Sequence, residues 1–230
     1  MGETIPIAGR DGRFDAYLSR PATTPSAAVI VIQEIFGVNR WLRGIADSLA
    51  ADGFLAVAPD LFWRFEPGLQ LDADVPAEFD RALSMYMQYQ EDDGVADLKA
   101  TVEAVRQLPD CNGKVGTMGF CLGGKLAYLM ACRSDTDCNL SYYGVGIEKN
   151  LGEADAIKRP LAMHFAREDR FVPREAQDAV EKRFAGSGLV TVYSYAGVDH
   201  AFGRPGNHYN AEAAELAEGR TRAFLRAHLG

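Results

Sequence analysis

Short apolar runs alternate along this chain with longer segments in which apolar residues recur every three or four positions. The run from Ala27 to Ile32 is continuously apolar, as expected of a strand that is covered on both faces. This alternation is typical of βαβ units, which form a mainly parallel sheet flanked by helices. We therefore expect an α/β fold with strands near residues 14–18, 27–32, 55–58, 114–118, 139–143, 161–165 and 189–195, and helices near 41–49, 95–105, 122–130, 173–184 and 210–229.

The sequence shows no internal division. Its 230 residues contain no repeat and no linker rich in Pro, Gly and Ser, and a hydrophobic content of 47% suffices for one sizeable core. We expect a single domain over residues 1–230. Residues 61–77 fit neither a strand nor a helix; this aromatic segment, with Phe62, Trp63 and Phe65, is predicted to be a loop that serves as a lid or pocket wall.

The charge balance excludes several classes of partner. The chain has 24 Lys and Arg residues against 32 Asp and Glu residues, a net charge of −8, so neither nucleic acid nor an anionic membrane surface is an expected partner. No apolar stretch approaches the ~20 residues that span a bilayer, and the N-terminus lacks the features of a targeting segment. Four cysteines without a C-x-x-C pair suit a reducing compartment, so we expect a soluble cytoplasmic protein.

One of these cysteines has an unusual setting. The stretch from Lys114 to Gly124 runs from an apolar strand through G-x-C-x-G, at Gly119, Cys121 and Gly123, directly into a helix. This pattern is typical of a nucleophile elbow with Cys in place of Ser, and the start of the helix favours a thiolate there. Two alternatives stay open: an inert buried cysteine, and a dinucleotide-binding loop, although the glycine spacing is not G-x-G-x-x-G.

An acid and a histidine follow the cysteine, each after a further predicted strand. Asp169 lies in the loop before the helix that begins near Pro173, and His200 lies in the loop before the last helix. Nucleophile, acid and histidine thus occur in the order of an α/β-hydrolase triad. Glu168 and Asp199 are neighbouring acids that compete for the orienting role. No paired His/Cys spacing supports a metal site, and we expect neither a metal nor another cofactor.

Several motifs together resemble the dienelactone hydrolase family over nearly the whole chain. They are Gln33-Glu-Ile-Phe-Gly-Val-Asn39, Gly119-Phe-Cys-Leu-Gly-Gly124, Tyr142-Tyr-Gly-Val-Gly146 and Asp199-His-Ala-Phe202. The resemblance implies a single α/β-hydrolase domain and a triad of Cys121, His200 and Asp169. It also implies a lactone or enol ester as substrate, which is hydrolysed through a thioester on the cysteine.

The resemblance assigns a further role to Glu34, a carboxylate at the end of a buried strand. Glu34 is expected to hold the resting thiol in its protonated form and to take the proton when substrate displaces it; a salt-bridge acid is the alternative. In an elbow of this kind the backbone N–H groups of Leu122 and of Ile35 are the expected oxyanion donors.

Arginines are expected to bind the carboxylate that dienelactones carry. Arg204, four residues after His200, matches a family position; a solvated surface arginine is the alternative. The second family arginine falls at Phe79 in this chain, and Arg81, two positions away, is a further candidate ligand.

The leading hypothesis is therefore a monomeric hydrolase of small anionic lactones or esters. A carboxylesterase of broader specificity is the alternative within the same class. A protein that binds ligands on a hydrolase fold, and a redox protein acting through Cys121, are the alternatives from other classes.

Overall fold

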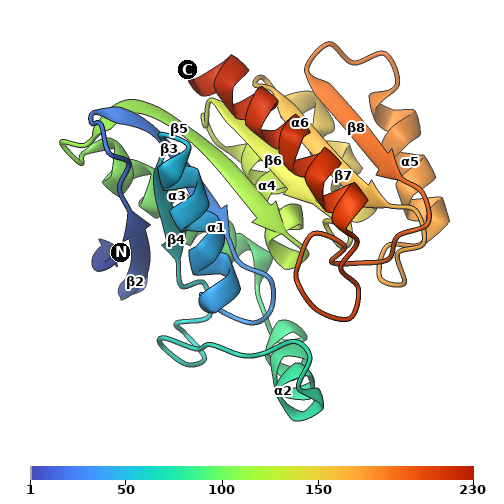
Figure 1. The fold of residues 1–230 in the computed structure, drawn as a ribbon, viewed down its shortest axis with the longest axis horizontal. Coiled ribbons are helices and arrows are strands. Elements are labelled where there is room, and N and C mark those ends of the chain that lie inside the picture. Colours follow the sequence, from blue (N-terminus) through green and yellow to red (C-terminus); the bar gives the residue numbers. More distant parts are fainter. Residues whose placement is uncertain (1) are drawn as a thin grey trace. The chain divides into compact units, whose positions relative to one another are not determined.

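The computed structural model describes residues 2–230 and shows an eight-stranded, mostly parallel sheet flanked by helices (Figure 1). Its strand order is β1-β2-β4-β3-β5-β6-β7-β8. The strands are β1 (Glu3–Ala8), β2 (Arg13–Ser19), β3 (Ser26–Ile32), β4 (Leu55–Pro59), β5 (Cys111–Phe120), β6 (Cys138–Tyr142), β7 (Leu161–Ala166) and β8 (Val190–Tyr195). The helices are α1 (Arg40–Ala51), α2 (Pro76–Tyr86), α3 (Glu91–Arg106), α4 (Leu122–Arg133), α5 (Arg174–Phe184) and α6 (Ala211–Leu229), and η1 (Ile147–Ala156) is a 3₁₀ helix. The expected α/β fold is confirmed.

Three elements were not among the expected strands and helices, and each buries little apolar surface. β1 contains Pro6 and buries only Ile7, which lies opposite Phe14 of the antiparallel neighbour β2. α2 buries only Ala82, and η1 buries two residues. Hydrophobic periodicity is weak in such segments, because few of their positions face a core.

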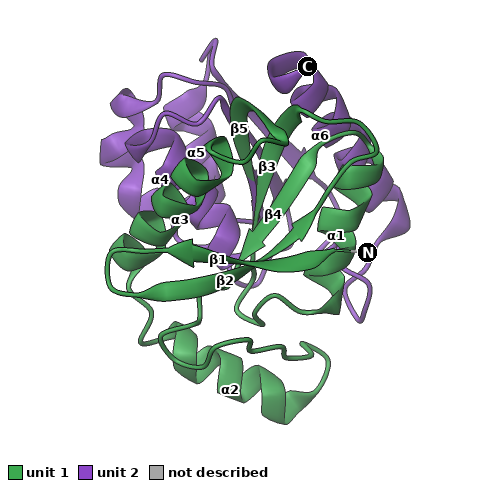
Figure 2. Cartoon of the chain, turned by 90° about the vertical axis from the view of Figure 1, so that its left-hand side faces the viewer, with its two compact units in different colours: residues 1–117 green, residues 118–230 purple. Residues whose placement is uncertain are grey.

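The chain divides into two compact units, residues 1–117 and 118–230 (Figure 2). In the first unit the strands β3 and β4 are parallel, and both are buried almost throughout. α1 and α3 pack on opposite faces of these two strands (Figure 2). The Asn39 side chain caps α1 by accepting the N–H of Leu42, which satisfies one of the amides left without a partner at a helix start.

The aromatic segment 61–77 is a loop up to residue 75, and α2 begins at Pro76. The buried side chain of Asp60 accepts the N–H groups of Phe62, at 3.0 Å, and Gly68, at 2.7 Å. The Trp63 indole donates to buried Asp97 on α3 at 2.9 Å. The loop is thus fixed at both a strand end and a helix; its role as a lid stays a prediction.

In the second unit β6, β7 and β8 are parallel neighbours, and α4 and α6 pack against opposite faces of β6 (Figure 1). His164 on β7 is buried, and its Nδ1 is 2.8 Å from the hydroxyl of Tyr195. Burial lowers the pKa of His164 to about 3, so the ring is neutral. His164 is therefore a core residue, as its place on a predicted strand indicates.

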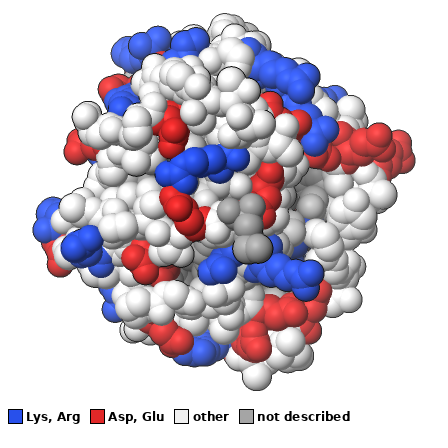
Figure 3. Space-filling view, turned by 60° about the vertical axis from the view of Figure 1, so that its left-hand side comes forward, with Lys and Arg blue, Asp and Glu red and all other residues white. Residues whose placement is uncertain are grey.

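Acidic and basic side chains are interspersed on the face of the molecule shown in Figure 3. Elsewhere in the structure charged side chains form ion pairs, such as that of Arg20 with Asp110, in which Nε and Oδ2 are 2.7 Å apart. Among residues 2–230 no helix combines the length and the apolar character that a membrane span requires.

Candidate active site

Cys121 lies between β5 and α4 in a backbone conformation that is unusual for any residue except glycine. Its φ is 54° and its ψ is −114°, and it is the N-cap of α4. A Cβ at Gly119 would collide with the carbonyl oxygen of Gly123, and one at Gly124 would collide with that of Tyr142. The small residues around the cysteine are thus required by the turn itself. This is the geometry of a nucleophile elbow.

Backbone strain is concentrated around this elbow. Within residues 2–230 the only residues other than glycine with positive φ are Cys121, Tyr143 at 39° and Ala201 at 63°. Tyr143 directly follows β6, and Ala201 directly follows His200. Such conformations cost of the order of 1–3 kcal/mol each, and they cluster where function requires them. The strain therefore marks the same region as the sequence motifs.

The side chains of Asp169 and His200 are hydrogen-bonded to each other. His200 Nδ1 is 2.8 Å from Asp169 Oδ2, and both side chains are almost fully buried. The other carboxylate oxygen, Oδ1, accepts the N–H groups of Phe171 and Val172 at 2.8 and 3.1 Å. The carboxylate is thus held from both sides and fixes the orientation of the ring. The neighbouring acid Asp199 accepts the backbone N–H of His200 instead.

The charge of His200 depends on the cysteine. Burial of the ring lowers its pKa, but the negative charge of Cys121 and the hydrogen bond with Asp169 outweigh burial and raise the pKa to about 10. Because Nδ1 bonds to Asp169, Nε2 is the ring nitrogen left for the sulfur. No hydrogen bond of ordinary geometry to Nε2 occurs among the described residues, so the sulfur acts on the ring mainly through charge.

Two aromatic side chains enclose the His200 ring. Tyr143 belongs to one of the family motifs, but the sequence did not indicate that it or Phe171 meets the histidine. Tyr143 and Phe171 meet it edge to face, with ring centroids 4.8 and 5.0 Å away. Phe171 is 43% exposed and so presents an apolar surface beside the histidine. The positive φ of Tyr143 and the contact of Phe171 with His200 both depend on the folded backbone. No local sequence pattern predicts either of them.

The remaining predicted site residues are divided between the two units. Leu122 and Arg204 lie in the second unit with the three residues already described, and Glu34, Ile35 and Arg81 lie in the first. Leu122 is the first residue of α4, so its N–H has no acceptor within the helix. Glu34 and Ile35 are buried just beyond the end of β3. This placement of Leu122 suits an oxyanion donor.

The two predicted arginine ligands have different surroundings. Arg204 is half-buried in the turn after His200, where its N–H bonds to the carbonyl oxygen of Ala201 at 2.9 Å. Arg81 lies on α2, is half-exposed and forms an ion pair with Glu66. A substrate carboxylate would have to compete with Glu66 for Arg81.

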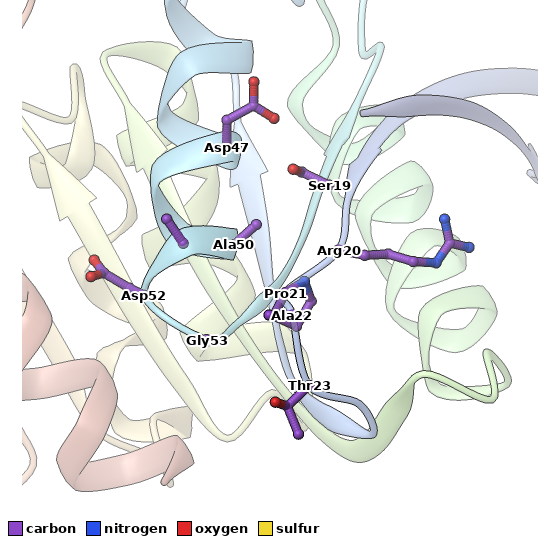
Figure 4. Close-up of a pocket in the computed structure, with 10 residues that line it drawn as sticks. Ser19, Arg20, Pro21, Ala22, Thr23, Asp47, Ala50, Asp52 and Gly53 are labelled. Atoms are coloured by element: carbon purple, nitrogen blue, oxygen red, sulfur yellow. The ribbon is translucent and has the colours of Figure 1, made fainter. Parts of the chain in front are cut away.

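A surface pocket of about 580 Å³ lies in the first unit, between the segment 19–23 and the end of α1 (Figure 4). None of the predicted site residues lines it. Among its charged residues, Arg20 donates to Asp110 and Asp47 accepts the hydroxyl of Tyr17. No group of three or more His, Cys, Asp or Glu side chains within residues 2–230 is arranged to hold a metal ion.

Comparison with known proteins identifies the family. The model of the dienelactone hydrolase family matches residues 14–229. A relative from Azospirillum brasilense, provisionally named carboxymethylenebutenolidase, is 46% identical, with 97% of each chain covered. Carboxymethylenebutenolidase 1 of Cupriavidus pinatubonensis is 38% identical, with 98% of this chain and 97% of that protein covered.

A solved structure shares the fold. The dienelactone hydrolase-like promiscuous phosphotriesterase P91 from metagenomic libraries superposes with a TM-score of 0.85 at 21% identity, covering 100% of this chain and 99% of that chain. With the near full-length relatives and the family match, the chain belongs to the dienelactone hydrolase family and is a hydrolase of carboxylic esters or lactones.

Proposed function

We propose that the protein opens a small lactone or enol ester that carries a carboxylate, in a reaction of the dienelactone to maleylacetate type, through a thioester on Cys121. The observation that carries the proposal is the strained elbow at Cys121, whose charge acts on a histidine bonded to Asp169. The match of residues 14–229 to the dienelactone hydrolase family, and the name of the Cupriavidus relative, support this substrate class.

In the first half of the proposed reaction Glu34 takes the proton of the Cys121 thiol when substrate binds, and the thiolate attacks the lactone carbonyl carbon. A C–S bond forms and the carbonyl electron pair moves to oxygen, where the N–H groups of Leu122 and Ile35 are the proposed donors. When this oxyanion collapses, the ring C–O bond breaks and the ring oxygen leaves as an enolate. The enolate takes from Glu34 the proton that came from the thiol and becomes a ketone, which leaves the acyl group on sulfur.

In the second half His200 is neutral and acts as a general base. It takes a proton from water as the water oxygen attacks the thioester carbonyl carbon. Collapse of the second oxyanion breaks the C–S bond, and the leaving thiolate takes the proton of the imidazolium, which restores the resting thiol and the neutral ring. Asp169 holds the ring in the tautomer with the proton on Nδ1 and stabilises the imidazolium that forms.

We also propose, on the family resemblance, that Glu34 keeps the resting thiol protonated. Replacing Glu34 by Gln removes a negative charge that disfavours the thiolate, so the thiolate fraction of the resting enzyme should rise several-fold. The measurement is the absorbance at 240 nm, corrected by the same reading on the double variant that also carries Cys121→Ala. An absorbance difference equal to that of the wild type would rule out this role and favour a structural ion pair.

Arg204, and Arg81 if it leaves Glu66, are the proposed carboxylate ligands. Loss of one charge-assisted pair costs about 1.5–3 kcal/mol, so Arg204→Ala should raise KM for a dienelactone about 10- to 100-fold while changing KM for a neutral aryl ester little. The measurement is steady-state turnover of both substrates by the wild type and by Arg204→Ala. Arg222→Ala, which breaks an exposed ion pair with Glu218 on α6, serves as a control.

The same assay separates the alternatives. If Arg204→Ala weakens turnover of the dienelactone and of the aryl ester equally, or changes neither, Arg204 does not bind the substrate carboxylate. Either result would favour a carboxylesterase of broader specificity. A wild-type protein that binds lactone without turning over either substrate would favour a ligand-binding role. The single domain over 1–230, the monomeric state and the cytoplasmic location also stay predictions.

A further inference from the structure

The side chain of Asp199 is hydrogen-bonded to both loops that carry the proposed acid and base. Its Oδ1 accepts the backbone N–H of His200 at 2.6 Å and the backbone N–H of Arg170, the residue after Asp169, at 3.1 Å. One carboxylate oxygen thus connects a neighbour of the acid to the histidine itself.

The second oxygen of Asp199 faces two basic groups. Its Oδ2 lies 3.2 Å from Nε of Arg170 and 3.4 Å from Nδ1 of His208. Burial opposes the charge, but the two backbone N–H groups and the charges of Arg170 and His208 outweigh it and lower the pKa of Asp199. Asp199 is therefore an anion at neutral pH, and its contacts with N–H groups are of the stronger, charge-assisted kind.

Asp169 lies between two residues that are hydrogen-bonded to the loop that carries His200. On one side of Asp169 the N–H of Glu168 bonds to the carbonyl oxygen of Val198 at 3.0 Å. On the other side Arg170 bonds to Asp199. Ala201, directly after His200, has a strained φ of 63°, so the backbone at the histidine needs a restraint that keeps it there.

We propose that Asp199 is a positioning residue that fixes Asp169 relative to His200, so that the Nδ1 to Oδ2 hydrogen bond is kept and Nε2 stays directed at the thiol. The inference rests on the proposed function, in which these groups act together. Asp199 itself touches neither the sulfur nor the reacting carbonyl.

The test compares three substitutions of Asp199. Asp199→Ala removes Oδ1, and Asp199→Glu keeps the charge but moves the carboxylate by one methylene, so both should lower kcat about 10- to 100-fold, the loss expected of a displacement near 1 Å. Asp199→Asn keeps an oxygen that can accept both N–H groups and should retain kcat within about fivefold. KM should change less than about threefold in all three, because none of the substitutions alters a proposed substrate contact.

A second readout does not depend on turnover. The pKa of His200, raised to about 10 partly by the Asp169 hydrogen bond, should fall in Asp199→Ala and Asp199→Glu and stay high in Asp199→Asn, as followed by NMR of the ring protons. The matched control is Asp155→Ala in the same unit of the chain. It breaks the ion pair of Asp155 with Arg183, whose nitrogen and oxygen are 2.6 Å apart, and should change neither kcat nor the pKa of His200.

The outcomes separate the inference from the proposed function. If the wild type hydrolyses neither substrate, the function fails, and the NMR titration still decides the role of Asp199. An unchanged His200 pKa and unchanged kcat in Asp199→Glu would overturn the inference. Should Asp199→Ala fail to fold, Asp199→Glu and Asp199→Asn decide it, because both keep a polar group at this position.

Discussion

Cys121→Ala should abolish ester and lactone hydrolysis, with a loss of at least about 1,000-fold in kcat, because in the proposed mechanism the acyl intermediate forms on this sulfur. The same substitution should lower the pKa of His200 from about 10 towards its ordinary value of 6.5, since the charge of Cys121 is the largest cause that raises it. Burial, which opposes the charged ring, and the hydrogen bond with Asp169, which favours it, both remain in the variant. An NMR titration should therefore show His200 losing its proton at a lower pH in Cys121→Ala than in an enzyme whose thiolate has formed, as Glu34→Gln favours, where the ring keeps it up to about pH 10.

The matched control is Cys111→Ala, which removes a free, half-buried cysteine at the start of β5. It should leave turnover and the His200 titration as in the wild type, and both variants should show the wild-type circular dichroism spectrum. Hydrolysis that persists in Cys121→Ala would refute the thioester mechanism. A redox role would predict instead a reversible sulfenate or disulfide at Cys121 under mild oxidant. Asp169→Asn would then have little effect on the oxidation of Cys121.

Much of the fold was predictable from local pattern. The buried parallel strand β3 is apolar from Ala27 to Ile32, and α1 has one apolar face, so the pattern of each element matches the surfaces that it buries. β1 and α2 bury one residue each, and their sequences carry almost no such signal. The order of strands in the sheet depends on contacts distant in sequence, which periodicity does not encode.

The candidate site divides in the same way. The elbow at Cys121 was predictable because its glycines prevent collisions between residues close in sequence. A Cβ at Gly119, for example, would collide with the carbonyl oxygen of Gly123. The contact of Asp169 with His200 was predictable from chain order and the family resemblance. The hydrogen bond from the backbone N–H of Arg170 to Asp199 joins residues 29 positions apart, and a backbone donor cannot be identified from residue types in a sequence.

Asp169→Asn should lower kcat by about 1,000-fold or more while leaving the fold intact. The N–H groups of Phe171 and Val172 both donate to Oδ1, so the amide oxygen of the asparagine will occupy that place. Its NH₂ group then takes the place of Oδ2, 2.8 Å from Nδ1 of His200. An NH₂ group donates, so Nδ1 must accept and the ring proton moves to Nε2. A ring protonated there in its neutral form cannot take a proton from water, so hydrolysis of the thioester should become the slow step.

This mechanism makes the Asp169→Asn result specific. The acyl-enzyme should accumulate in the variant, where mass spectrometry of the quenched reaction would detect the added acyl mass, and the pKa of His200 should fall because the hydrogen bond with the Asp169 carboxylate that raises it is lost. Glu168→Gln is the matched control, because this neighbouring acid is exposed and its backbone N–H, which the substitution keeps, bonds to the other loop. A large loss in Glu168→Gln with normal turnover in Asp169→Asn would show that the orienting acid has been assigned to the wrong residue. Accumulation of the acyl-enzyme in Asp169→Asn alone is the result that the hydrogen bonds at Oδ1 and Oδ2 require.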